Sequence, residues 1–345
     1  MSQRFVVVGL DHRHVYELVG GLLAAGLECA GYWTSTSDMR VLAGFRERYP
    51  DLVGVDDRAA LMEDRSAAIL VCAAVPADRA GIAAEAMRHG KDVLMDKPGV
   101  TAAADLVLLE RVVAETGRIF SICFSERFLV PAATVALRLI REGAIGRVVQ
   151  TAGFGPHRLN RALRPGWFFD PALYGGILAD IGSHQIDQFL TFTGSEDARI
   201  VASTVGCFAD VRTPDLVFEN FGEIVLRSDV ASGYCRVDWF TPDGLGNWGD
   251  GRLTVVGTEG TIELRKYIDV AGRAGTDHLF ITDRVGSRYV DCSGEPCGYF
   301  AGFARDCRDR TESLMTQGHV FTVCRLALAA QAQAERVVLP GGMPV

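Results

Sequence analysis

Short apolar runs alternate with longer helix-like segments through the first third of the chain. The apolar runs are rich in Val, Ile and Leu and end at Gly, Pro or polar residues, which predicts buried strands at residues 5–9, 28–33, 68–72, 92–95 and 119–124. The segments between them predict helices at residues 14–25, 37–49, 77–89 and 102–116, with Ser37 as the N-cap of the second. Strands that alternate with helices at this spacing predict a doubly wound parallel sheet, which binds ligands at the carboxyl ends of its strands.

The remainder of the chain changes to a mainly β pattern. β-rich runs separated by turn residues predict strands at 148–154, 200–208, 219–226, 232–239, 253–256, 261–264, 279–282 and 287–291. Helices are predicted at 130–142, 299–310 and 318–334, and a further helix follows the glycines that open the stretch 175–190. We therefore expect two α/β domains, residues 1–124 with the parallel sheet and residues 125–345 with a large, mostly antiparallel sheet. The free face of that sheet needs a cover, so a homo-oligomer, a dimer or a tetramer formed through the C-terminal sheet, is expected.

Composition and charge exclude several classes of protein. The 345 residues are 48% hydrophobic and 23% charged, which is typical of a globular protein. A net charge of −8 without a basic run argues against nucleic-acid binding. There is no apolar run of the ~18 residues that a membrane helix needs, and the N-terminus enters a strand without a signal-peptide pattern. The nine cysteines are scattered and the Cys292/Cys297 spacing is weak evidence for a metal, so we expect a reducing, cytoplasmic setting and no metal site.

The helix predicted within the stretch 175–190 contains three ionisable residues close together. Asp180, His184 and Asp187 stand at i, i+4 and i+7, so the helical spacing places them on one face. Two carboxylates and an imidazole are costly to bury unless they pair or do chemistry. The alternative is an ordinary amphipathic helix whose polar stripe meets water. Because apolar residues fill most of the remaining helix surface, acid–base chemistry is the favoured interpretation.

The turn after the first strand departs from a dinucleotide fingerprint. That fingerprint requires Gly-x-Gly-x-x-Gly, whereas this chain has Gly9-Leu10-Asp11-His12-Arg13-His14, which keeps only the first glycine. One interpretation is a phosphate site that has degenerated. The other, which we favour, is an altered loop in which His12, Arg13 and the helix N-terminus hold the anion.

The end of the second strand is the expected position of a ribose-binding residue. An acidic residue there selects the free 2′-hydroxyl of NAD. This chain has Thr34 and Ser35, followed by Arg40, which suits a 2′-phosphate and favours NADP; Arg40 is equally compatible with an ordinary solvent-facing helix position.

A loop at residues 155–171 combines arginines with aromatic residues. Arg158, Arg161 and Arg164 are candidates for holding an anionic group, and Trp167 offers a flat wall for a sugar or ring face. A surface loop with solvated arginines and a packed Trp167 is the alternative. The substrate-binding candidates are His157, Arg164, Trp167, Asp180 and His184.

Several motifs, in their order and spacing, resemble one known family. They are Asp96-Lys97-Pro98 after a strand, Asp180-Ile181-Gly182-Ser183-His184 on a helix, Phe124-Ser125-Glu126-Arg127-Phe128, Gly143-Ala144-Ile145-Gly146-Arg147-Val148, and Gly257-Thr258-Glu259-Gly260-Thr261-Ile262. Over essentially the whole chain the sequence resembles the Gfo/Idh/MocA oxidoreductases. The resemblance implies an N-terminal Rossmann domain, a C-terminal α/β domain with a large, mostly antiparallel sheet, and NAD or NADP as cofactor.

The resemblance also implies roles for individual residues. Lys97 and His184 correspond to the catalytic pair, and Asp180 to their orienting or substrate-binding partner. Ala73, Val75, Asp96 and Pro98 correspond to positions along the cofactor. The cofactor-binding candidates together are Gly9, Leu10, Asp11, His12, Arg13, Thr34, Ser35, Arg40, Ala73, Val75, Asp96, Lys97, Pro98 and Ser125. Two residues depart from the family pattern: Arg79 stands where His is usual, and Ser125 where Asn is common.

Three functions are compatible with these residues. The leading hypothesis is hydride transfer between a nicotinamide and a sugar, cyclitol or related polyol, with His184 as general base and Lys97 stabilising negative charge. The second is a nicotinamide-using enzyme with a net non-redox outcome, such as elimination or glycoside cleavage. The third is a non-catalytic ligand or cofactor sensor on the same fold. Lys97, Asp180 and His184 together argue against a sensor, which needs no base.

Overall fold

The computed structural model describes residues 3–36, 39–208 and 218–337, and these form two compact units. The first unit comprises Met1–Cys123, Pro165–Gly175 and Gly298–Cys324. The second comprises Phe124–Arg164, Gly176–Cys297 and Arg325–Val345. The division into domains 1–124 and 125–345 stays a prediction, and the units differ from it in that two later segments belong to the first unit.

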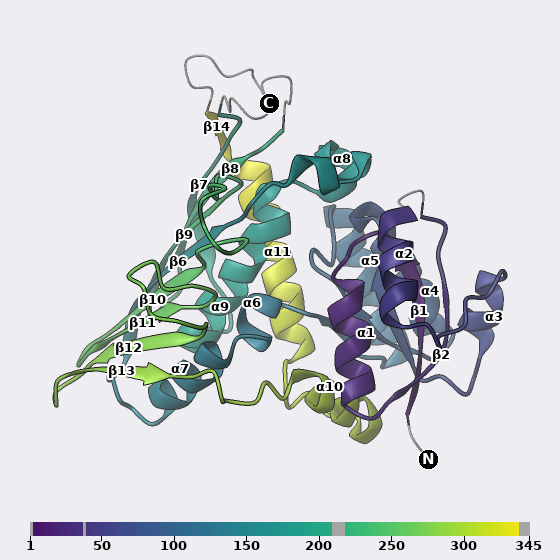
Figure 1. Ribbon diagram of the computed structural model, residues 1–345, viewed down its shortest axis with the longest axis horizontal. Coiled ribbons are helices and arrows are strands. Elements are labelled where there is room, and N and C mark those ends of the chain that lie inside the picture. Colours follow the sequence, from purple (N-terminus) through teal and green to yellow (C-terminus); the bar gives the residue numbers. More distant parts are fainter. Residues whose placement is uncertain (1–2, 37–38, 209–217, 338–345) are drawn as a thin grey trace. The chain divides into compact units, whose positions relative to one another are not determined.

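A parallel sheet forms the centre of the first unit (Figure 1). Its strands are β1 (Arg4–Leu10), β2 (Glu28–Trp33), β3 (Ile69–Ala73), β4 (Asp92–Met95) and β5 (Phe120–Ile122). They lie in the order β2-β1-β3-β4-β5 and every neighbouring pair is parallel. All residues of β3 and β4 are buried, as expected for strands covered on both faces. The predicted doubly wound sheet is confirmed, and its strand order reverses between β1 and β3, where such sheets bind ligands.

The helices of the first unit are α1 (Val15–Ala24), α2 (Met39–Arg48), α3 (Arg58–Glu63), α4 (Arg79–Arg88), α5 (Ala103–Thr116), α8 (Pro171–Tyr174) and α10 (Tyr299–Asp309). Helices α1 to α5 lie between these strands in the chain, and α8 and α10 come from later segments. α5 ends where Gly117 takes a left-handed conformation with φ of 64°. The predicted cap Ser37 lies outside the described residues. The helix expected at 77–89 begins with a 3₁₀ turn, Pro76–Asp78, and becomes α-helical at Arg79.

Polar contacts join the late segment Gly298–Cys324 to the parallel sheet. Arg310 donates to both carboxylate oxygens of Asp92 at 2.8 and 2.7 Å. The side chain of Gln317 donates to the carbonyl of Phe120 and accepts from its N–H, both at 3.1 Å. Asp92 and Phe120 are the first residues of short strands, so these contacts attach a distant part of the chain to β4 and β5.

The second unit is built on a large mixed sheet. Its strands are β6 (Val148–Pro156), β7 (Arg199–Gly206), β8 (Phe221–Arg227), β9 (Ser232–Asp238), β10 (Arg252–Gly257), β11 (Thr261–Arg265), β12 (His278–Thr282), β13 (Ser287–Asp291) and β14 (Glu335–Val337). They lie in the order β13-β12-β11-β10-β6-β9-β8-β7-β14. The pairs β6–β9 and β7–β14 are parallel and the others antiparallel, so the sheet is mostly antiparallel as predicted. β14 was not predicted.

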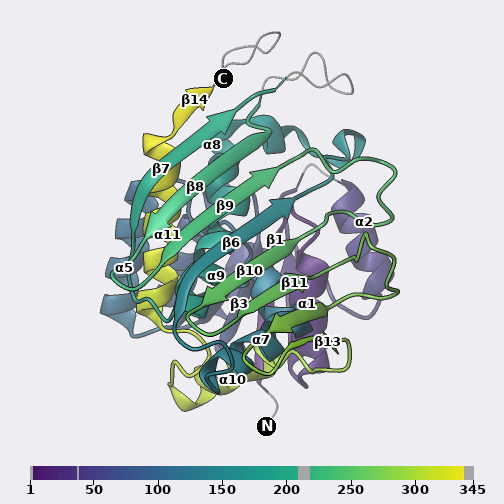
Figure 2. The same ribbon diagram turned by 90° about the vertical axis from the view of Figure 1, so that its left-hand side faces the viewer.

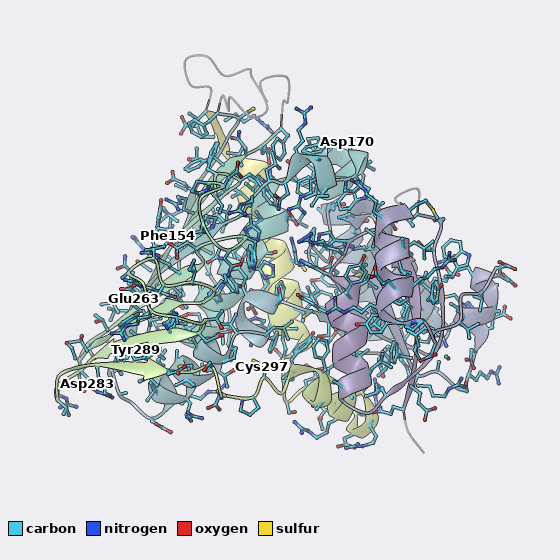
Figure 3. All side chains as sticks on the ribbon, viewed as in Figure 1. Phe154, Asp170, Glu263, Asp283, Tyr289 and Cys297 are labelled. Atoms are coloured by element: carbon cyan, nitrogen blue, oxygen red, sulfur yellow. The ribbon has the colours of Figure 1, made fainter. Side chains whose placement is uncertain are left out.

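Helices pack on one face of this sheet. They are α6 (Ser125–Phe128), α7 (Pro131–Arg141) and α9 (Ser183–Thr193), while α11 (Gln317–Gln333) runs through both units. α7 contacts β11 and β12, and α9 contacts β6 and β9. Figure 2 views the sheet with these helices behind it. Partly exposed side chains occupy the opposite, outer face, among them Phe154, Glu263 and Tyr289 (Figure 3).

Within the described ranges, no helix is long and apolar enough to cross a membrane.

Candidate functional site

The turn after β1 is tied to the end of β3. Gly9 has φ of 85°, and a Cβ at this position would lie 2.5 Å from the Cβ of Ala74, so only glycine fits. The N–H groups of Asp11 and His12 both donate to the carbonyl of Ala73 at 3.0 Å. In the described structure this leaves the N–H groups of Arg13 and His14 as the donors at the start of α1 that make no backbone hydrogen bond.

Asp96, immediately after β4, gathers three donors from different elements of the first unit. Its Oδ2 accepts from His12 Nδ1 at 2.7 Å and from Arg79 Nη2 at 3.0 Å, and its Oδ1 accepts from His14 Nδ1 at 2.8 Å. Because an ionised carboxylate only accepts, both rings are assigned as Nδ1–H tautomers. We call Asp96, His12, His14 and Arg79 the Asp96 cluster.

The partners of Asp96 favour its ionised form. Burial alone would raise the pKa of Asp96, but the charges of His14 and Arg79 and the hydrogen bond from His12 hold this pKa well below its usual range. Burial lowers the pKa of His12 to about 3, with the nearby His14 acting in the same direction, so His12 is neutral at physiological pH. The carboxylate is therefore ionised while the ring beside it is not.

Arg79 holds the turn that carries Lys97. Its side chain is fully buried and donates to the carbonyls of Ala74, Asp96, Lys97 and Pro98 at 2.8, 2.9, 2.6 and 2.9 Å. Each of these carbonyls would be costly to bury without a donor. The arginine that stands where the family usually has histidine therefore fixes the backbone on both sides of the predicted catalytic lysine.

The geometry of the Asp96 cluster also bears on metal binding. His12, His14 and Asp96 are the only group of three or more His, Cys, Asp or Glu side chains in the described ranges with ligand atoms within 4.8 Å of one another. A divalent cation there would have to share one carboxylate with the buried guanidinium of Arg79, close to the charge of Lys97. This excess of positive charge favours a hydrogen-bonded network, and the absence of a metal stays a prediction.

The predicted ribose-binding positions are partly occupied by backbone contacts. The Oγ1 of Thr34 accepts from the N–H groups of Leu10 and Thr36 at 3.2 and 3.1 Å, whereas Ser35 and Arg40 are exposed. Burial raises the pKa of Asp11, and hydrogen bonds from Thr36 and from the Val75 backbone oppose this rise. The carboxylate that replaces the second glycine of the fingerprint is thus held by donors at the ends of β2 and β3.

The stretch 175–190, predicted as a helix that follows two glycines, passes from the first unit into the second after Gly175. Gly175 and Gly176 have φ of 88° and 92°, a π-helical turn follows at Leu178–Gly182, and α9 begins at Ser183. The helix after the glycines is confirmed, and the π-helical turn was not predicted. Two side chains accept from the first N–H groups, which have no acceptor within a helix. Glu219 accepts from the N–H of Ile177 at 2.9 Å, and Gln331 from that of Leu178 at 3.0 Å.

Asp180 and His184 are buried on either side of the junction between the π turn and α9, with 6% and 2% of their surface exposed. Asp187, the third polar residue of this stretch, accepts two hydrogen bonds from Arg127 at 2.7 Å each. The ion pair accounts for Asp187 structurally. The wet-stripe alternative is wrong for this stretch, because all three polar side chains are buried.

A second buried carboxylate, which the sequence did not predict as functional, lies in the same region. The Oε2 of Glu126 on α6 accepts from Gln185 Nε2 at 2.8 Å and from Lys266 Nζ at 3.0 Å. Glu126 and Lys266 are 2% and 0% exposed. Burial alone would raise the pKa of Glu126, but the charges of Lys266, His184 and His157 lower it to about 2. Glu126 is therefore ionised, and its field reaches both predicted site histidines of this unit.

Aromatic side chains surround His157 and Arg164. The His157 ring lies 5.3 Å from Trp239 and 4.6 Å from Trp248, and the Arg164 guanidinium lies 5.0 Å above Trp239. Trp248 also packs on Tyr267 at 4.4 Å. We call His157, Trp239, Trp248 and Tyr267 the aromatic cluster.

Two arginines predicted as anion ligands donate hydrogen bonds to backbone carbonyls, and their role as anion ligands stays a prediction. Arg158 donates to the carbonyls of Pro242 and Leu245 at 2.9 and 2.5 Å, and Arg164 donates to that of Leu159 at 2.9 Å. Trp167 belongs to the first unit, where its ring lies 6.2 Å from that of His12. The three substrate-binding candidates of the loop are thus divided between the units.

Known proteins show the same architecture. Residues 134–263 match a model of the GFO/IDH/MocA C-terminal domain. A solved structure of a putative oxidoreductase from Erwinia carotovora atroseptica is 42% identical, covers 98% of this chain and 100% of its own, and superposes with a TM-score of 0.93. The chain belongs to the Gfo/Idh/MocA oxidoreductase family.

Curated relatives are more distant. A scyllo-inositol 2-dehydrogenase (NAD(+)) from Bacillus subtilis is 25% identical over 297 residues, which is 81% of this chain and 80% of that protein. An uncharacterised oxidoreductase from Schizosaccharomyces pombe is 24% identical over 247 residues, and the match spans 69% of this chain and 65% of that relative.

Family motifs identify some residues of the site and miss others. Lys97, Asp180 and His184 could be named because they belong to short motifs. Lys266 and Trp239 could not, because they lie far apart in sequence and in runs that also predict ordinary core. Glu126 lies within the motif Phe124–Phe128, but no role was predicted for it. The only signal was charge within apolar surroundings, as at Lys266 after the strand residues Ile262 and Leu264.

Proposed function

We propose that this family member is an NAD- or NADP-dependent oxidoreductase that transfers a hydride to or from the carbinol carbon of a sugar, cyclitol or related polyol. The observation that carries the proposal is the retention of Lys97, Asp180 and His184 in a Gfo/Idh/MocA chain. All three are at least 90% buried, and Lys97 lies in a turn fixed by Arg79.

The first unit fits a dinucleotide despite its altered loop. Gly9 keeps the tight turn, the strand order reverses at β1 and β3, and the start of α1 offers the N–H groups of Arg13 and His14. The negative charge of Asp11 is met by donors from Thr36 and Val75, which reduces its repulsion of a phosphate. The residues proposed to hold the cofactor are Gly9, Leu10, Asp11, His12, Arg13, Thr34, Ser35, Arg40, Ala73, Val75, Asp96, Lys97, Pro98 and Ser125. When bound, the nicotinamide supplies the hydride acceptor or donor.

The protein side chains handle the proton and the charge. His184 accepts the hydroxyl proton of the substrate as general base. Lys97 donates a hydrogen bond to the same substrate oxygen and stabilises its developing negative charge. Asp180 orients the imidazole or binds a neighbouring hydroxyl. A dry environment strengthens each of these interactions, and the burial of the three side chains supports these roles.

A hydroxylated ring is the substrate class that the residues support. The Bacillus subtilis relative is named for a cyclitol, scyllo-inositol. The aromatic cluster beside Arg164 offers flat apolar faces next to polar groups, a combination that suits the CH face and the hydroxyls of such a ring. We propose His157, Arg164, Trp167, Asp180 and His184 as substrate-binding residues.

The surroundings of the enzyme are also part of the proposal. The outer face of the large sheet carries partly exposed apolar and aromatic side chains such as Phe154, Phe280 and Tyr289, which supports a homo-oligomer formed through this face. None of the nine cysteines forms a disulfide, in agreement with the proposed cytoplasmic location.

A thermal-shift screen followed by kinetics tests this function. NAD, NADP, NADH and NADPH are added separately, and a bound dinucleotide should raise the melting temperature by mass action. Turnover is then followed at 340 nm with scyllo-inositol, myo-inositol and a panel of aldoses. Lys97→Met and His184→Ala should each reduce kcat by about 10²–10⁴-fold with little change in melting temperature, whereas the exposed His89→Ala serves as the matched control. The proposal fails if no dinucleotide shifts the melting temperature, which would favour a sensor, or if both variants keep wild-type rates.

A further inference from the structure

Glu126 is a buried carboxylate that the proposed chemistry leaves without a role. Its Oε2 has two donors, Gln185 and Lys266, while its Oε1 is buried and has no hydrogen-bond partner in the described structure. An ionised oxygen without a donor is costly in a protein interior. The two donors on Oε2 therefore leave part of the charge of Glu126 to interact with other groups of the same region.

Two side-chain connections join α6 to α9. Both involve residues of α9 that follow His184 in the sequence. Glu126 accepts from Gln185, the residue after His184, and Arg127 binds Asp187 through both guanidinium donors. The amide of Gln185 has little freedom, because a Cβ at Gly153 or Gly155 of β6 would lie 2.3 or 2.9 Å from it. Helix, strand and ion pair therefore hold the Glu126 carboxylate at a set place near the predicted base.

The charged pairs near His184 differ in how strongly they interact with its imidazole ring. Arg127 and Asp187 neutralise each other at 2.7 Å. Glu126 and Lys266 also form a pair, at 3.0 Å, but the charge of Glu126 interacts directly with those of His184 and His157. Coupling between two titrating groups is reciprocal. Protonated His184 favours the ionised form of Glu126, so ionised Glu126 favours the protonated form of His184.

We propose that Glu126 is a positioning residue for the predicted base: its carboxylate, held by Lys266 and Gln185, stabilises the imidazolium that forms when His184 takes the hydroxyl proton of the substrate. The proton moves from the substrate oxygen to the His184 ring, and Glu126 stays ionised throughout. This inference rests on the proposed function for the role of His184. It adds a second anion, from a separate helix, to the Asp180–His184 motif.

Titration of His184 in the full-length protein tests the proposal without a substrate. Histidine ring signals are followed by NMR in ¹³C-histidine-labelled protein, and His184→Asn assigns the signal. Glu126→Gln should lower the midpoint of the His184 titration by about 1 pH unit or more, as expected when an opposite charge is removed. Glu223 lies on β8 and accepts a hydrogen bond from Tyr234 of β9. Glu223→Gln is the matched control and should leave the midpoint unchanged.

A second variant keeps the test valid if Glu126→Gln does not fold. Glu126→Gln leaves Lys266 buried without a counter-ion, whereas Glu126→Gln/Lys266→Met removes both charges and is expected to be tolerated better. The His184 midpoint should fall in the order wild type, double variant, Glu126→Gln. An unchanged midpoint in the double variant, with the ring signals still dispersed, would overturn the proposal.

Kinetics separate this inference from the proposed function. With a polyol that the wild type oxidises, the double variant should lower kcat by roughly tenfold, move the acidic limb of its pH profile to lower pH and leave KM nearly unchanged. If the wild type shows no nicotinamide-dependent turnover, the proposed function fails while the NMR result still decides the role of Glu126. An active double variant with a wild-type pH profile would contradict the inference alone.

Discussion

A buried carboxylate in each unit, Asp96 in the first and Glu126 in the second, has a cationic partner, and the two carboxylates are bonded differently. In the first unit Asp96 has donors on both oxygens, from His12, His14 and Arg79. In the second, Glu126 has two donors on one oxygen and none on the other within the described residues. A buried network in which every oxygen has a donor holds its members in one arrangement. A carboxylate with donors on only one oxygen can still interact with a charge that forms nearby. We infer that Asp96 serves the shape of its unit and Glu126 its chemistry.

The largest expected effect is a loss of stability when the charge of Asp96 is removed. Asp96→Asn removes the charge that holds Arg79, and breaking a buried ion pair in this way costs about 3–5 kcal/mol of unfolding free energy. Urea denaturation followed by circular dichroism measures this loss. The exposed Asp51→Asn is the control and should change the unfolding free energy by less than about 0.5 kcal/mol. A loss below 1 kcal/mol in Asp96→Asn would show that the cluster does not hold the unit together.

The next effect is the pH dependence that His12 gives to stability. Its pKa is about 3 in the folded protein against an ordinary value of 6.5, so the unfolded chain binds a proton between these values and the folded chain does not. The stabilisation is complete above pH 6.5 and is lost as the pH falls toward 3.

Urea titrations between pH 7.5 and 5.0 measure this slope, in a range above the ordinary pKa of the carboxyl groups. His12→Gln should reduce the slope by up to about 1.4 kcal/mol per pH unit relative to the wild type. The exposed His89→Gln should leave it unchanged. Equal slopes in the His12 variant and the wild type would mean that His12 is not buried in its neutral form.

The smallest effect compares the aromatic side chains of the two units. Trp248, which is 36% exposed and packs on His157 and Tyr267, should contribute binding that is equal in the ground and transition states. Trp248→Ala is therefore expected to raise KM for a polyol substrate by about tenfold, or roughly 1.4 kcal/mol, with kcat nearly unchanged. Trp167→Ala in the first unit, beside His12, provides the comparison. A fall in kcat with an unchanged KM in Trp248→Ala would contradict a binding role.

Much of the fold could be predicted because its signals are local. β2 and β4 begin and end at the predicted residues, since β-branched and apolar runs bounded by turn residues specify short buried strands. The π-helical turn that contains Asp180 and the acceptors of the first N–H groups of this helix were not predicted. These acceptors, Glu219 and Gln331, lie 42 and 153 residues from the N–H groups that they bind. No local pattern contains such partners.

The residues of the candidate site likewise divide into those that a local motif identifies and those that depend on distant partners. Lys97 and His184 were identifiable because a motif fixes their neighbours in sequence. The interpretation of Arg158 and Arg164 as anion ligands did not anticipate that their guanidinium groups bind carbonyls, because a loop sequence does not reveal which backbone groups it leaves unsatisfied. The same limit hid Arg79, whose role depends on four carbonyls of the turns after β3 and β4.

By itself, the sequence determined the alternation of strands and helices, the change to a mostly antiparallel sheet and the residue types of the catalytic motifs, since each depends on periodicity or on neighbours along the chain. Tertiary structure alone decided which buried charges are neutralised. Asp96 meets His12, His14 and Arg79, and Glu126 meets Lys266, across separations of 17 to 140 residues. A charge can be buried only where its partner also arrives, and that arrival is a property of the folded chain.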